Sequence, residues 1–302
     1  MKKYLTKFDT ISDYNSFIEG STKEYVNVSY IVDDDEVKYW HYIDYSKMYL
    51  TFEVVEAGTI KIGKWTSNAP TVTIQYSSDN GSTWNSITSS TTTKSLGEYS
   101  IGDKIILKGT NNTYGAQYGY NKLTSTAKLK VYGNIMSLIY GDNFIGQTTL
   151  PSNYTFSHLF DSSSIDDYAN IIEAENLILP ATTLTKACYS GLFYYTHITS
   201  APKLPATTLA ESCYDNMFRG GRFTKAPELP ATTLVKNCYA DMFNQAGLVN
   251  YVKCLATDIS AENCTTNWLN YVSSTGTFVK DANTTWPSGV SGIPSGWTVV
   301  DA

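Results

Sequence analysis

The chain has 302 residues, enough for about two domains at the usual ~100–200 residues each. Its 22 Lys and Arg against 28 Asp and Glu give a net charge of −6, which argues against the basic surface of a nucleic-acid-binding protein. Aromatic residues make up 14% of the chain and charged residues 17%, a composition typical of β-rich proteins that act in recognition.

Residues 1–45 predict a small N-terminal docking arm. Residues 8–19 have the apolar spacing of a short helix, and residues 26–32 alternate like a strand. Residues 36–42 predict the return strand of a hairpin. The acidic run between the two strands, residues 33–36, predicts a turn. A calcium loop is the alternative, but the run has no Gly and no bidentate Glu at the required distance.

The start of the chain is positively charged, but no apolar run of a secretory signal peptide follows it. No stretch approaches the ~18 apolar residues that a membrane span requires. We therefore expect a protein that is neither inserted in a membrane nor exported by the general route.

Residues 46–140 predict an antiparallel β-sandwich of jelly-roll type. Short alternating segments are separated by clusters of Gly, Asn, Ser and Thr, and little of the segment has helical spacing. The expected strands are residues 50–55, 59–62, 72–76, 104–108 and 129–132.

Residues 77–84 match the Asp-box pattern Ser-x-Asp-x-Gly-x-Thr-Trp. We expect Asp79 to accept hydrogen bonds from turn amides, Gly81 to adopt a positive φ, and Trp84 to pack beneath the hairpin. The pattern resembles the hairpins of sialidase-like propellers. Because it occurs once and is not catalytic there, it predicts a structural hairpin.

Residues 141–280 contain a sequence repeated with a period of 25. Leu-Pro-Ala-Thr-Thr-Leu occurs three times, and each copy is followed by a Cys-Tyr pair and a Phe. A fixed period of this length predicts a solenoid, in which each unit buries its apolar face against its neighbours. Residues 281–302 predict a C-terminal cap. The residues expected to stack inward are Leu179, Cys188, Phe193, Leu204, Cys213, Phe218, Leu229, Cys238 and Phe243.

Each unit predicts an extended segment followed by a short helix. The residue before a proline is disfavoured in helix, and Leu184, Cys188 and Leu192 lie at i, i+4 and i+8. This alternation indicates leucine-rich-repeat architecture. A fourth unit carries Trp268 in place of the repeated Phe.

The cysteines predict a buried ladder of thiols rather than a metal site, because a spacing of 25 is not that of zinc ligands. The sequence leaves open whether Cys254 and Cys264 pair. We expect no metal and no cofactor.

We expect no enzymatic activity. The three histidines, His41, His158 and His197, lie in separate segments, and the chain has no nucleophile elbow, zinc-binding helix or phosphate loop.

The units differ most in the short stretch after each Phe. One interpretation is an unconstrained loop; the other is a recognition edge for a glycan or a protein, because variation between repeats often lies on the binding face. The candidate ligand-binding residues are Tyr194, Tyr195, His197, Arg219, Arg222, Asn244 and Gln245.

The repeated units resemble the BspA-like leucine-rich repeats of gut Bacteroidetes and their phages, with segments such as APKLPATTLAESCYDNMF and APELPATTLVKNCYADMF. The likeness covers roughly residues 48–302. The opening segment resembles structural proteins of crAss-like tailed phages.

This resemblance implies a virion structural protein, a head fibre or a tail-associated protein. It would dock to other virion proteins through residues 1–45, form a homo-oligomer, and present its repeats to the host surface. The alternatives are a bacterial cell-surface adhesin and a carbohydrate-binding accessory module.

Overall fold

The computed structural model describes residues 6–7, 26–33, 36–163 and 169–302. Two compact units divide the chain, Met1–Met48 and Tyr49–Ala302.

The first unit contains a three-stranded sheet in the order β1-β3-β2. β1 is Thr6–Lys7, β2 is Val26–Asp33 and β3 is Glu36–Ile43, with a 3-10 turn at Tyr45–Lys47. β2 and β3 pair antiparallel, so the predicted hairpin is confirmed. The helix predicted over residues 8–19 lies outside the described residues.

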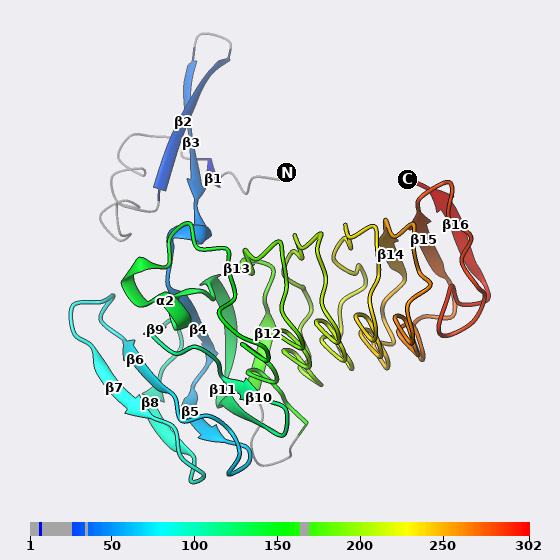
Figure 1. Ribbon diagram of the computed structural model, residues 1–302. Coiled ribbons are helices and arrows are strands. Elements are labelled where there is room, and N and C mark those ends of the chain that lie inside the picture. The colour runs from blue at the N-terminus through cyan, green and yellow to red at the C-terminus, as the bar shows by residue number, and fades with distance from the viewer. Residues whose placement is uncertain (1–5, 8–25, 34–35, 164–168) are drawn as a thin grey trace. The chain divides into compact units, whose positions relative to one another are not determined.

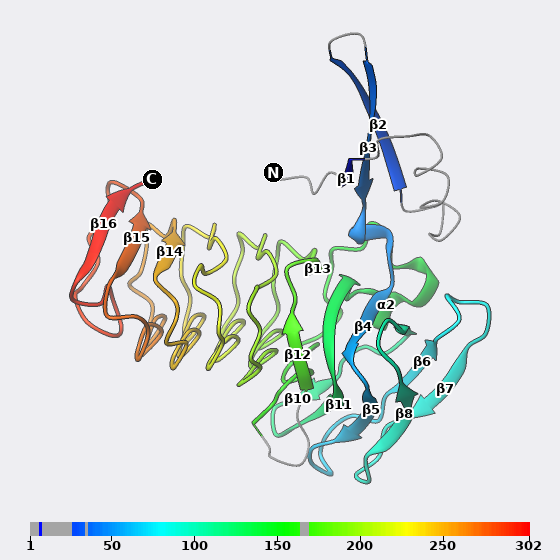
Figure 2. The same cartoon turned by 180° about the vertical axis from the view of Figure 1, so that it is seen from behind.

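The second unit begins with a ten-stranded sheet in the order β7-β6-β9-β4-β11-β5-β8, and β10, β12 and β13 also pair with β11 (Figures 1 and 2). A short helix, α2 (Ser137–Tyr140), and a 3-10 turn (Gly141–Asn143) follow β11. The strands are β4 (Leu50–Glu56), β5 (Gly58–Lys64), β6 (Thr73–Ser77), β7 (Asn85–Thr88), β8 (Lys94–Tyr99), β9 (Lys104–Gly109), β10 (Gly115–Ala116), β11 (Gly119–Asn134), β12 (Ala169–Glu173) and β13 (Leu177–Ile178).

The predicted fold class, a jelly-roll β-sandwich followed by a leucine-rich-repeat solenoid with a cap, is wrong. The chain is mainly β, with 33% strand and 4% helix, and one nearly closed, barrel-like antiparallel sheet replaces the sandwich. The reason lies in β11. Its first half (121–125) pairs with β5 and its second half (128–132) pairs with β4. One long strand therefore joins two halves of the sheet that would form separate sheets in a sandwich.

The polar middle of β11 explains why its length was underestimated. Ser125 is buried, but its Oγ lies 3.0 and 2.9 Å from the carbonyl oxygens of Thr59 and Ala127, so its one hydroxyl hydrogen has an acceptor on either side. Hydrogen bonding thus compensates the burial of a polar group, so the strand extends well before the predicted residues 129–132.

The Asp-box hairpin between β6 and β7 has the expected geometry. Asp79 accepts hydrogen bonds from the amide of Thr83 at 2.9 Å and from its hydroxyl at 2.6 Å. Gly81 has a φ of 86°. Trp84 lies against Gly81 and under the ammonium group of Lys108, which is 3.9 Å from its ring centroid.

The short helix predicted in each repeat is replaced by a chain of consecutive turns. In the unit around Cys213, the amides of Cys213 and Asp215 donate to carbonyls three residues earlier. Ser212, Asn216 and Gly220 have φ values of 57°, 55° and 77°, so every fourth residue is left-handed. This turn ribbon has a period of four, which explains why apolar residues at i, i+4 and i+8 mimicked a helix.

Each 25-residue unit forms one coil of the chain. The amides that do not close these turns donate hydrogen bonds to the next coil. Tyr214 donates to the carbonyl of Cys238 at 3.1 Å, and Phe218 donates to that of Met242 at 2.9 Å. Alternate amides therefore close turns within a coil and bind the neighbouring coil, which satisfies the backbone without helix or long strand.

Two columns of aromatic rings run through the coils. Tyr189, Tyr214 and Tyr239 stack with centroids 5.9 and 6.1 Å apart. Phe193, Phe218 and Phe243 stack at 5.8 and 5.9 Å. Each stacked pair is worth roughly 0.5–1.5 kcal/mol beyond its burial. Both columns continue to the barrel-like sheet, here called the curled sheet, through the first coil, which contains Phe156 and Phe160. Phe156 stacks on Tyr114, and Phe160 packs against Phe52.

The last rings differ from the sequence expectation. Trp268 does not replace the repeated Phe but stacks on Tyr239 at 6.1 Å, and Trp286 stacks on Trp268 at 5.3 Å. A parallel sheet of β14 (Tyr251–Cys254), β15 (Gly276–Lys280) and β16 (Trp297–Asp301) ends the chain.

In the turn ribbon, a glycine substitution at a left-handed position should have the opposite effect on stability from the same substitution in a helix. Ser212→Gly should raise the free energy of unfolding by about 1 kcal/mol, because a left-handed φ strains every residue with a Cβ. In a helix the same change would destabilise the protein. Urea denaturation tests this, with Ser190→Gly as the control that should destabilise. Loss of stability in both variants would contradict the ribbon.

Candidate functional site

Four of the candidate binding residues meet on one edge of the coils. Tyr194 and Tyr195 pack edge to face, with ring centroids 4.7 Å apart. Arg219 on the next coil has its guanidinium carbon 5.9 Å from the Tyr194 ring centroid and 5.7 Å from that of Tyr195. Gln245, one coil further, accepts a hydrogen bond from the Tyr195 hydroxyl at 2.8 Å. We call these four residues the recognition strip.

The Tyr195 ring lies across the intervening coil because residue 220 is glycine. A Cβ at Gly220 would lie 2.6 Å from Cδ1 of Tyr195. Tyr195, Gly220 and Gln245 are the left-handed residues at the same position of three successive turn ribbons. The ring, the gap and the acceptor are therefore aligned, and the half-buried Tyr195 is held in one orientation with part of its surface open to solvent.

Two carboxylates lie beside Arg219. Its Nη1 is 3.9 Å from Oδ1 of Asp241 and 3.4 Å from Oδ1 of Asn216. Asp215 accepts a hydrogen bond from Nδ2 of Asn216 at 2.7 Å. Burial, and then the negative charge of Asp241, raise the pKa of Asp215 to about 6.

A buried ion pair of Lys122 and Asp161, with His158 beside it, lies on the other side of Tyr194. His158 contacts the Tyr194 ring edge to face at 5.8 Å, and its Nδ1 is 2.8 Å from Oδ2 of Asp161. Lys122 donates to Oδ1 of the same carboxylate at 3.0 Å. Burial would raise the pKa of Asp161, but the hydrogen bond from His158 and the charge of Lys122 outweigh it and lower that pKa to about 2.

This cluster was missed in the sequence because Lys122 lies on β11, far along the chain from His158 and Asp161, which are three residues apart. Repeat alignment contains a partial signal for His158: it precedes Phe160 by two residues, as Gly191 precedes Phe193. The structure places the His158 ring against Gly191, in the same way that Tyr195 lies over Gly220.

The other three candidate residues do not join the strip. Asn244 is buried and donates to Oδ1 of Asp241 at 2.5 Å. His197 and Arg222 are exposed. Partial burial, and then the nearby charge of Arg222, lower the pKa of His197.

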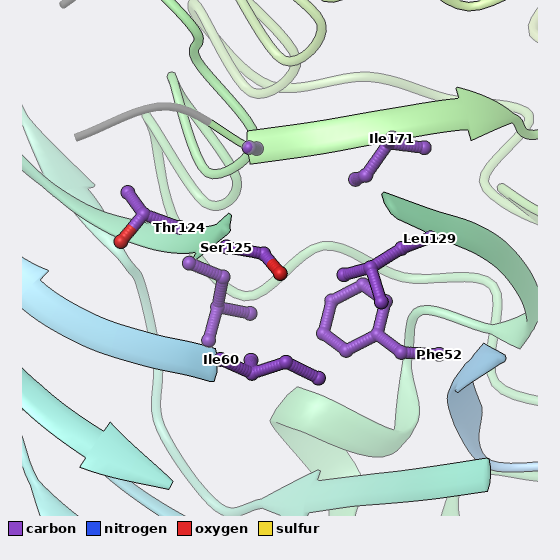
Figure 3. Close-up of a pocket in the computed structure, with 8 residues that line it drawn as sticks. Phe52, Ile60, Thr124, Ser125, Leu129 and Ile171 are labelled. Carbon is purple, nitrogen blue, oxygen red and sulfur yellow. The ribbon is translucent and has the colours of Figure 1, made fainter. Parts of the chain in front are cut away.

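A small void inside the curled sheet does not offer a ligand site (Figure 3). It has no room for a water molecule, so it is a packing irregularity of the core. The side chains around it are Phe52, Ile60, Leu123, Thr124, Ser125, Leu129, Ala169 and Ile171.

All five cysteines are free and buried, Cys254 and Cys264 included. Burial raises the pKa of Cys188, Cys238 and Cys254 to about 12, so these thiols stay protonated at neutral pH. Among the residues that the structure describes, no group of three His, Cys, Asp or Glu could hold a metal ion. No helix in the described part of the chain is long and apolar enough to cross a membrane.

Comparison with known proteins gives no assignment: no family model, no curated protein and no solved structure matches the chain. The resemblance to BspA-like repeat proteins and to phage structural proteins therefore stays a prediction.

The raised pKa of Asp215 predicts a pH-dependent stability. The folded state binds this proton more tightly than the unfolded state, whose carboxyl has a pKa of 3.8, so stability should rise as the pH falls from about 6 to about 4. Asp215→Asn should therefore raise Tm at pH 7.5 and change it less at pH 4.

Thermal denaturation across this range provides the measurement. Glu98→Gln, which removes an exposed carboxylate, is the control and should leave the profile unchanged. A Tm difference between Asp215→Asn and the wild type that stays constant from pH 4 to 7.5 would contradict the burial of this carboxylate.

Proposed function

We propose that this protein is a non-enzymatic attachment protein whose recognition strip binds a glycan on the host surface. One observation carries the proposal: the Tyr195 ring is held across Gly220 by its hydrogen bond to Gln245, beside the guanidinium of Arg219. Aromatic, cationic and amide groups from three coils thus converge on one exposed edge.

The chemistry of this edge suits a sugar. One face of a pyranose ring carries C–H groups, which gain dispersion energy against an aromatic ring such as Tyr195. Its hydroxyls take hydrogen bonds from guanidinium and amide groups, which Arg219 and Gln245 supply. Because the coils hold these groups in place before binding, little conformational entropy is lost when the ligand binds.

The location that we propose is the virion, with residues 1–45 docking the protein as a head fibre or a tail-associated protein. The support is the resemblance of the opening segment to tailed-phage structural proteins. Several copies on one particle would add their individual contacts, so weak binding by each strip would suffice for attachment.

A glycan array probed with the purified full-length protein tests the ligand class. Tyr195→Ala and Arg219→Ala should each weaken binding to the recognised glycans about ten-fold, equivalent to about 1.4 kcal/mol. Arg222→Ala removes a guanidinium from outside the strip and should leave binding unchanged. An unchanged thermal transition would show that each variant is folded.

Two results would overturn the glycan proposal. One is the absence of binding by the wild-type protein to any glycan. The other is equal binding by Tyr195→Ala, Arg222→Ala and the wild type. Binding to host surface proteins in the absence of glycan would favour a protein ligand.

Mass spectrometry and immunogold labelling of purified phage particles test the location. Labelled particles are the expected result, and the position of the label separates head from tail. Label on the bacterial envelope with none on particles would overturn the virion role and favour the adhesin.

A further inference from the structure

The recognition strip continues beyond Tyr194 onto the curled sheet. His158, on the first coil, packs against Tyr194 and stacks on Tyr120 of β11, with centroids 4.3 Å apart and the rings within 17° of parallel. Tyr120 in turn stacks on Trp65, which directly follows β5, at 6.3 Å and 5°. Four aromatic contacts therefore form an unbroken path from Trp65 to Tyr195.

Backbone and side-chain contacts fix the sheet end of this path. The amide of Trp65 donates to the carbonyl of Tyr120 at 2.9 Å. The ammonium group of Lys122 lies 3.8 Å from the Trp65 ring centroid and 3.0 Å from Asp161. Since Asp161 also binds His158, one buried carboxylate positions the cation under Trp65 and the imidazole beside Tyr120.

This buried arrangement is costly to form. The side chains of Lys122 and Asp161 are 3% and 1% exposed, so both charges are removed from water. Pairs of this kind contribute little net stability, because desolvation offsets their attraction. What the pair does supply is a defined orientation for Trp65, which remains 44% exposed.

We infer that Trp65, Tyr120 and His158 form a second subsite, so that the ligand is an extended, neutral, linear oligosaccharide lying across the first coils and onto the sheet. This inference rests on the proposed function, and it defines the ligand as a chain of several sugars rather than a single terminal residue. The sheet is then part of the binding surface.

The charges along the aromatic path from Trp65 to Tyr195 indicate that the oligosaccharide is uncharged. Lys122 and His158 contact Asp161, and Arg219 faces Asp241 with Asp215 nearby. The charges of Lys122 and Arg219 are thus balanced by those of Asp161 and Asp241, and an anionic polymer would meet Asp215 and Asp241 without a surplus of positive charge. The hydroxyl groups of a neutral sugar are uncharged and are not repelled by these carboxylates.

A length series tests the inference. The probe is the neutral linear oligosaccharide that the wild-type protein binds best on the array, shortened stepwise to a disaccharide, with affinities measured by calorimetry. Wild-type affinity should rise with length. Trp65→Ala should remove this rise, with a loss of about ten-fold for the longest chain and no change for the disaccharide, equivalent to about 1.4 kcal/mol.

Two comparisons complete the test. Tyr195→Ala should weaken binding at every length, and Ile101→Ala, which alters a residue 72% exposed on the turn between β8 and β9, should change nothing. Trp65→Phe keeps a ring at this position and should restore part of the length dependence.

The outcomes separate the inference from the proposed function. A Trp65→Ala variant that equals the wild type at all lengths, or that loses affinity equally at all lengths, would overturn the second subsite. Tighter binding of an anionic oligosaccharide of equal length would overturn the neutral ligand. Absence of binding by the wild type at any length would overturn the proposed function, and the inference with it.

Discussion

The fixed distance between coils is the constraint on which the rest of this structure depends. Alternate amides of each turn ribbon donate to the next coil, as Tyr214 does to Cys238. This distance keeps the buried rings in contact, with tyrosine centroids 5.9 and 6.1 Å apart. Hydrogen bonds and ring contacts thus support the same geometry, and the columns transmit it to the sheet through Tyr114 and Phe52.

The candidate site is a consequence of the same register. One position of the turn ribbon carries Tyr195, Gly220 and Gln245 in three successive coils. The side chains at this position therefore form one continuous surface, and a substitution in one coil changes one part of it. The large ring of Tyr195 requires the absence of a side chain at Gly220 on the next coil, and its hydroxyl requires the acceptor of Gln245 on the coil after that. The variable stretches after each Phe are therefore interdependent and are not free to vary separately.

Much of the local structure could be predicted because it depends on residues close in sequence. The hairpin of β2 and β3, the strands β4, β5, β6 and β9, and the Asp-box turn all follow from alternation and turn chemistry. The turn ribbon was mistaken for helix because a period of four and a period of 3.6 place the same apolar residues on one face over two turns. Trp268 was assigned to the wrong column because spacing shows that an aromatic residue recurs, and not which ring it meets.

The sequence alone specified the 25-residue period, the residues that recur within it, and the stretches in which the units differ. Only the tertiary structure showed that β11 joins two half-sheets, and that Trp65, Tyr120 and His158 meet Tyr194. The physical reason is separation along the chain. Periodicity reports which side chains share a face of one element, whereas contacts between the sheet and the coils depend on strand register and on buried charges such as Lys122 and Asp161, which leave no local pattern.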